Sequence, residues 1–122
     1  MSHEIVSGWQ GRFYEDFAPG HVYRGRFGHT VTEADNALFT QLTHNTNPLH
    51  FDAEYARRTR WGQILVNSTF TLALVVGMSV PDISENAVSN LGWEDVKLTH
   101  PVFIGDTLYC ETDVLEKRPS KS

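Results

Sequence analysis

The eight residues from Asn45 to Asp52 carry the side chains of this chain that are best suited to acid–base chemistry. They read Asn45-Thr46-Asn47-Pro48-Leu49-His50-Phe51-Asp52, and so bring together two amides, a histidine and a carboxylate. Pro48 locks its own φ angle and drives Asn47 toward an extended conformation. We therefore expect a stiff connection that holds His50 in one place, where an imidazole can gain or lose a proton near neutral pH.

Two helices are expected to position this stretch. Thr32 can cap a helix, with Asp35 as a weaker form of the capping-box acid. Ala34, Leu38 and Leu42 recur at helical spacing, which predicts a helix from about Glu33 to Thr43. Asp52 is well placed to cap a second, short helix that ends near Arg58. We interpret Asp52 as a helix cap in preference to a catalyst.

Residues 65–80 are apolar on nearly every side, which predicts a long buried helix. Asn67, Ser68 or Thr69 could cap its start, and Pro81 should end it. The segment is short for a bilayer span of roughly 20 residues and polar at its start, so we expect no membrane segment.

Alternating residues predict strands over residues 21–30, over residues 86–98 with a break at Gly92, and over residues 107–116. The apolar residues among residues 1–10 show no regular spacing that would predict a helix or a strand. The aromatic-rich residues 9–17 are expected to lie extended over a core. An antiparallel sheet around one long apolar helix makes an α+β fold.

The composition limits the function classes. The chain has 122 residues, enough for one domain, and a net charge of −5, which argues against a nucleic-acid partner. The densest basic cluster is Arg57, Arg58 and Arg60. We interpret it as a solvated helix end in preference to a phosphate site.

The single cysteine, Cys110, allows no intrachain disulfide and is interpreted as a half-buried strand residue. No two histidines have the i, i+4 spacing of a helical zinc site, so no metal is expected. The first residues lack the pattern of a signal peptide, and we expect a cytoplasmic protein.

The segment Asn47-Pro48-Leu49-His50, followed by Asp52 and Ala56, resembles the hydratase motif of the MaoC-like dehydratases, the (R)-specific enoyl-CoA hydratase group. The turn at Gly62 and the run Pro101-Val102-Phe103-Ile104-Gly105-Asp106-Thr107-Leu108 also resemble features of that family. The resemblance covers roughly residues 11–117. It implies one hot-dog domain over residues 1–122, an antiparallel sheet wrapped around a long central helix, in a homodimer or larger assembly.

Members of the family usually continue with two more strands, so the domain is expected to be short at its C-terminal end. Either the chain is a shortened form that lacks its last strands, or a neighbouring subunit covers the gap.

The resemblance also implies a reaction. In the family an Asp and a His hold a water that adds to an enoyl-CoA thioester, and a backbone N–H at the start of the central helix polarises the thioester carbonyl. No cofactor is implied. His50 matches the motif His and Asn47 the motif Asn, whereas Asn45 stands where the family has the acid. Asn67 and Ser68 fall where many members have His-Gly, so the N–H of Ser68 is the expected carbonyl donor.

Asn45 leaves the chemistry open, because an amide can orient a water but cannot take its proton. Three alternatives stay open. His50 acts as the only base, another carboxylate such as Asp52 or Asp35 folds into the site, or the site binds a thioester without turnover. The first interpretation is a hydratase/dehydratase of enoyl thioesters. The alternative is a non-catalytic acyl-CoA-binding or structural subunit, and a hot-dog thioesterase is a weaker third.

Overall fold

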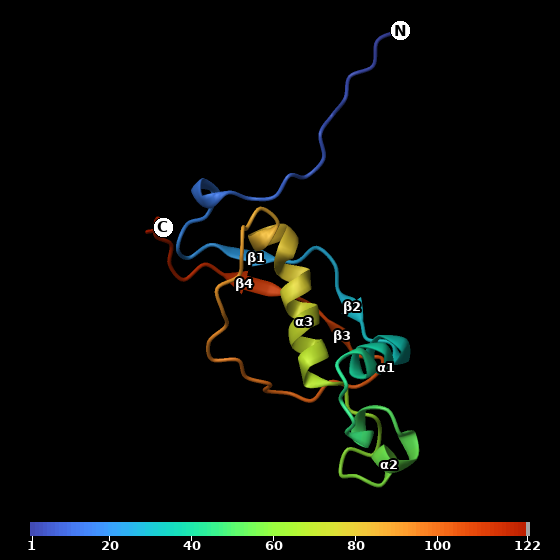
Figure 1. The fold of residues 1–122 in the computed structure, drawn as a ribbon. Coiled ribbons are helices and arrows are strands. Elements are labelled where there is room, and N and C mark those ends of the chain that lie inside the picture. The colour runs from blue at the N-terminus through green and yellow to red at the C-terminus, as the bar shows by residue number, and fades with distance from the viewer. Residues whose placement is uncertain (122) are drawn as a thin grey trace.

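The computed structural model describes residues 1–121, so Ser122, the last residue of the expected domain, lies outside the described residues. Helix α3 (Ser68–Ser79) crosses the strands, and α1 (Glu33–Leu42) lies beside its first turn (Figure 1). The other elements are η1 (Tyr14–Asp16), β1 (Val22–Arg24), β2 (His29–Thr30), η2 (Pro48–His50), α2 (Ala53–Arg57), the π-helical η3 (Val80–Ser84), β3 (Thr107–Leu108) and β4 (Glu111–Asp113).

The two strands expected over residues 21–30 and 107–116 pair with each other, antiparallel, but each is split. Strand β1 pairs with β4, with Tyr23 opposite Thr112, and β2 pairs with β3, with His29 opposite Leu108. Backbone bonds extend the pairing at both ends, from Gly20 to Val114 and from Val31 to Asp106. The result is one long antiparallel ribbon with a single interruption.

A bulge causes that interruption, because residues 25–28 stand opposite only Tyr109 and Cys110. A Cβ atom at Gly28 would lie 2.6 Å from the ring of Tyr109, so a larger residue there requires that exposed ring to move. Cys110, expected to be a half-buried strand residue, is buried and lies in the break between β3 and β4.

The expected helix α1 is confirmed, with its capping box. The Thr32 hydroxyl accepts from the Asp35 N–H at 3.1 Å, and the Asp35 carboxylate accepts from the Thr32 N–H at 3.0 Å. At the other end the N–H groups of His44 and Asn45 donate to Gln41 and Thr40, which is a Schellman ending. His44 has a φ of 57°, in the left-handed region where glycine is usual. This ending fixes the direction in which the chain enters Asn45.

The apolar stripe of α1 faces solvent, which the helical spacing did not indicate. Leu38 and Leu42 are 60% and 70% exposed, whereas Asn36 and Thr40 are completely buried. Positions i and i+4 share one helix face, so Asn36 and Thr40 form a polar pair that points into the molecule.

Helix α3 differs from the expected buried helix in three ways. It begins at Ser68, three residues later than expected, although Asn67 caps it as one of the predicted candidates, and it does not stop at Pro81 but runs on as the π-helical turn η3. None of its residues is fully buried. Its apolar surface is only partly covered because the expected third strand does not form against it.

The prediction of a strand over residues 86–98 is wrong, since this segment has no regular structure and Val88, Leu91 and Trp93 are exposed. It loops away from α3 (Figure 1). Cavities of about 540 and 330 Å³ separate α3 from Trp93. A strand needs a neighbour that satisfies its backbone N–H and C=O groups, and none of residues 1–121 supplies one here.

Residues 9–17 were expected to lie extended over a core, but they contain the short helix η1, and Trp9 and Phe13 are exposed. The segment instead contacts η3, beyond the end of α3. Trp9 donates from its ring N–H to the Pro81 carbonyl at 3.0 Å, and Arg12 forms an ion pair with Asp82 at 3.2 Å. Among residues 1–121 no helix has the length and apolar character needed to cross a membrane.

Asp35 makes the stability of α1 depend on pH. The Thr32 N–H and then the His29 ring, 2.8 Å away, hold the pKa of Asp35 below its ordinary value of 3.8. A lowered pKa stabilises the folded state above pH 3.8, and this contribution disappears as the pH falls through the folded value. We expect Asp35→Asn to lower the free energy of unfolding at neutral pH and to match the wild type in acid. Urea unfolding from about pH 7 to about pH 2.5 measures this, and a difference that stays constant would contradict it.

Candidate active site

One ring nitrogen of His50 forms a hydrogen bond, and the other has no partner among residues 1–121. Its Nδ1 lies 2.7 Å from the carbonyl oxygen of Leu65. A carbonyl oxygen only accepts, so Nδ1 carries the proton and a neutral ring keeps its lone pair on Nε2. The backbone is held as well, because the Leu65 N–H donates to the Leu49 carbonyl at 3.3 Å. The half-buried imidazole is therefore oriented to take a proton at Nε2.

The two motif amides lie in tight turns of the backbone before His50. The Asn45 side-chain oxygen accepts from the Asn47 N–H at 3.0 Å, and the Asn47 side-chain oxygen accepts from the Leu49 N–H at 3.1 Å. Pro48 begins η2, and Asn47 is extended as expected before a proline. The Asn45 NH₂ group meets no acceptor among residues 1–121, so it can still donate to a water.

The two carboxylates considered as replacement acids are both used as helix caps. Asp52 accepts from the Tyr55 N–H at 3.0 Å at the start of α2, as expected of a cap. Asp35 is engaged by Thr32 and His29 at the start of α1. Neither carboxylate forms a hydrogen bond with His50 in the described part of the chain.

Asn36, which the sequence did not single out, joins the His50 turn to the start of α3. Its NH₂ group donates to the His50 carbonyl at 2.8 Å, and its side-chain oxygen accepts from the Asn67 N–H at 2.9 Å. Asn67 in turn donates from its side chain to Thr40 at 3.3 Å and caps α3 by accepting from Thr69 at 3.0 Å. The only available signal was the i, i+4 spacing of Asn36 and Thr40 on α1.

A pocket of about 240 Å³ lies at the start of α3. Leu65 and Val66 form one wall, Ser68 and Thr71 come from the first turn of α3, and the remaining lining residues are Trp61, Leu98, Thr99, His100, Pro101 and Val102. The N–H of Asn67 is taken by Asn36. In contrast, no acceptor among residues 1–121 bonds the N–H of Ser68. A free N–H at the first turn of a helix favours a ligand oxygen with negative charge.

The structure brings some of the expected site residues together and leaves others apart. Ser68 lines the pocket, and His50 is bonded to Leu65, which also lines it. His50 itself is not among the residues that line this pocket in the described chain. Asn67 is buried and holds the cap of α3, while the oxygens of Asn45 and Asn47 bond backbone N–H groups. The arrangement can supply one base and one carbonyl-polarising donor.

Within residues 1–121 no group of three or more His, Cys, Asp or Glu side chains is arranged to hold a metal ion.

Known proteins share this framework. The family model of the MaoC like domain matches residues 16–122. Mesaconyl-CoA hydratase of Cereibacter sphaeroides is 37% identical over 105 residues, 86% of this chain and 31% of that protein. Beta-methylmalyl-CoA dehydratase of Chloroflexus aurantiacus is 33% identical over 111 residues, 91% of this chain and 32% of that protein.

A solved structure shows the same fold. The MaoC domain protein dehydratase from Chloroflexus aurantiacus superposes with a TM-score of 0.84 at 32% identity, covering 91% of this chain and 32% of that one. The chain thus spans about a third of the length of these relatives. Because the family model matches most of its length, the chain belongs to the MaoC-like dehydratase domain family and has its α+β hot-dog fold.

Proposed function

We propose that this protein is a hydratase/dehydratase that adds water to, or removes it from, the 2,3-double bond of an enoyl-CoA thioester. The observation that carries the proposal is the connection of His50, through Leu65, to the pocket that Ser68 lines. His50, with Nε2 available as a base, is bonded to Leu65, and Leu65 lines the same pocket as Ser68, whose N–H has no acceptor among residues 1–121. Relatives named as a hydratase and a dehydratase of CoA thioesters support it.

The proposed reaction uses these two groups in sequence. His50 Nε2 takes a proton from water as the water oxygen bonds to C3 of the enoyl group. The electrons of the 2,3-double bond move toward the thioester oxygen, where the Ser68 N–H stabilises the enolate. C2 then takes the proton from His50, so that one water has been added and the base restored. A donor that polarises an oxyanion is typically worth roughly 10²–10³ in rate.

In this scheme Asn45 orients the attacking water through its free NH₂ group, and Asn47 holds the shape of the turn. His50 is then the only acid–base residue, and protonation of His50 stops hydration because the base is lost. We also expect a homodimer or a larger assembly. The exposed Leu38 and Leu42 on α1 and the incompletely covered α3 favour such contacts. The cytoplasmic location stays a prediction.

The non-catalytic alternative remains a second candidate because of one observation. Asn45 replaces the acid with an amide, and its oxygen is already bonded to the Asn47 N–H. A protein of this kind would bind a CoA thioester without converting it.

A hydration assay on three proteins separates the two functions. We expect the wild type to hydrate crotonyl-CoA, with loss of the enoyl thioester absorbance. His50→Ala should lose roughly 10²–10⁴ in kcat, because it removes the general base. Asn45→Asp should increase kcat, since it restores a second proton acceptor. Thioester binding measured by calorimetry controls for folding of each variant.

No absorbance change with any enoyl chain length, together with tight binding of the thioester, would establish the non-catalytic alternative. Gain of activity by Asn45→Asp alone would identify a hydratase scaffold that has lost its acid.

The role of Asn36 can be separated from simple stability. Asn36→Leu leaves the His50 carbonyl and the Asn67 N–H without their partner, so we expect a lower unfolding temperature and at least a tenfold lower kcat, with KM little changed. Thr40→Val is the matched control. It removes one buried bond of the same network but none to His50, so it should lower the unfolding temperature and spare kcat.

Both variants are assayed well below their unfolding temperatures. An equal loss of kcat in the two variants would mean that Asn36 acts on stability alone and does not position His50.

A further inference from the structure

The three arginines at the C-terminal end of α2 and just beyond it, Arg57, Arg58 and Arg60, make different contacts. Arg57 forms an ion pair with Glu54 on the same helix, and Arg58 donates from Nε to the Glu54 carbonyl at 3.2 Å. These two complete the C-terminal end of α2, as the sequence indicated. Arg60 pairs with no carboxylate among residues 1–121. Its guanidinium carbon instead lies 4.5 Å from the centre of the Trp61 ring.

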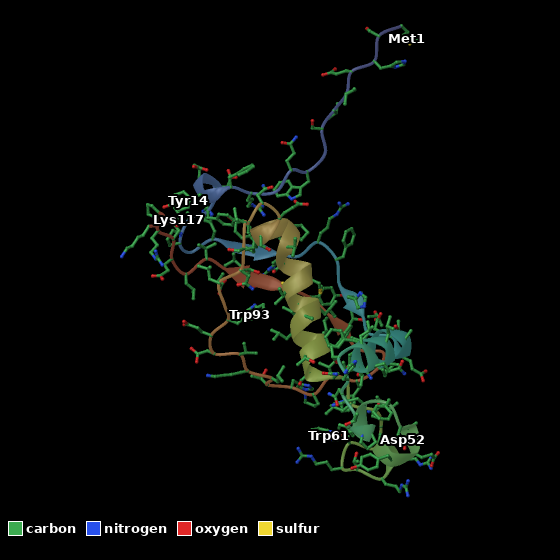
Figure 2. All side chains as sticks on the ribbon, viewed as in Figure 1. Met1, Tyr14, Asp52, Trp61, Trp93 and Lys117 are labelled. Atoms are coloured by element: carbon green, nitrogen blue, oxygen red, sulfur yellow. The ribbon has the colours of Figure 1, made fainter. Side chains whose placement is uncertain are left out.

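Trp61 connects Arg60 to the candidate active site. The Trp61 ring lines the pocket that contains Ser68, and it also contacts the ring of Phe103, with 6.2 Å between centroids. Phe103 is anchored by its bridge to Leu65. Figure 2 shows Trp61 on the lobe that carries α2, at the end of the molecule away from the chain termini. The indole is therefore a fixed surface, and Arg60 lies against it beside the pocket.

The size of the pocket limits what it can enclose. Its volume of about 240 Å³ is below the roughly 300–1,000 Å³ of sites that surround a drug-sized ligand. It can hold the acyl end of a thioester next to the Ser68 N–H. The nucleotide of coenzyme A, with its phosphates, has to lie outside on the surrounding surface. The net charge of −5 makes that surface unfavourable for phosphates unless a local cation is present.

We propose that Arg60, held on the face of Trp61, binds the phosphates of coenzyme A and makes this chain prefer a CoA thioester to a thioester without a nucleotide. The inference rests on the proposed function, because it takes the Ser68 pocket as the thioester site. A guanidinium can bond phosphate oxygens through two N–H groups at once. Its contact with the indole restricts the side chain before binding, which reduces the ordering cost.

The test compares two substrates that differ only in the nucleotide: crotonyl-CoA and crotonyl-pantetheine. For Arg60→Gln we expect KM for crotonyl-CoA to rise about tenfold, while KM for crotonyl-pantetheine and both kcat values stay within about twofold. The rise in KM for crotonyl-CoA should be smaller in about 0.5 M salt, because an exposed ion contact is screened. Arg57→Gln is the matched control and should change the KM of neither substrate, since Arg57 is paired with Glu54.

If Arg60→Gln changed KM equally for both substrates, or for neither, the assignment of Arg60 would be overturned. Calorimetry with free coenzyme A keeps this result separate from failure of the proposed reaction. If the wild type binds coenzyme A without turnover and Arg60→Gln weakens that binding about tenfold, the phosphate site stands and the hydratase function fails. If the wild type turns over crotonyl-pantetheine but does not distinguish it from crotonyl-CoA, the phosphate site fails alone.

Discussion

The buried amide of Asn36 is the interaction on which the rest of the site depends. It is 1% exposed, and it bonds two groups that lie 14 and 31 residues further along the chain, the His50 carbonyl and the Asn67 N–H. A buried amide is tolerated only when both of its ends are paired, because each unpaired polar group costs about 1–3 kcal/mol. Only one placement of α1 satisfies both bonds. That placement holds the His50 turn at a set position relative to the first turn of α3.

The same requirement explains why α1 turns its leucines outward. Pointing Leu38 and Leu42 into the molecule would remove Asn36 and Thr40 from the turn and the cap that they stabilise. Every buried side-chain nitrogen and oxygen within residues 1–121 has a partner, so the polar network is complete. A complete network specifies one arrangement, whereas the apolar face of a short helix could pack in several. The outward leucines are then available for contacts with another chain.

The site combines a rigid part and an open part. Rigidity comes from the turn before His50, where each motif amide is bonded to a backbone N–H and Pro48 restricts the chain. The open part is the segment 86–98, which lacks a paired strand and leads into the pocket wall at Leu98. Part of the pocket lining is therefore held by hydrogen bonds, whereas Leu98 belongs to a segment with few of them. Ordering of that segment by a partner strand would change the pocket without moving His50.

The sequence by itself determined the local features, because these depend on neighbouring residues. The capping box of α1, the Asn47-Pro48 turn, the Asp52 cap, a cap of α3 at or next to Asn67, and strands within residues 21–30 and 107–116 were all predicted from short-range rules. The family motif likewise directed attention to His50 and Asn45. The tertiary structure alone decided which face of α1 is buried, that residues 86–98 form no strand, and which arginine lies beside the pocket. The first two depend on a partner far away in the sequence: a buried carbonyl for Asn36 and a ladder neighbour for a strand. The third depends on where Trp61, the next residue after Arg60, packs, and Trp61 packs beside Phe103 from a distant part of the chain.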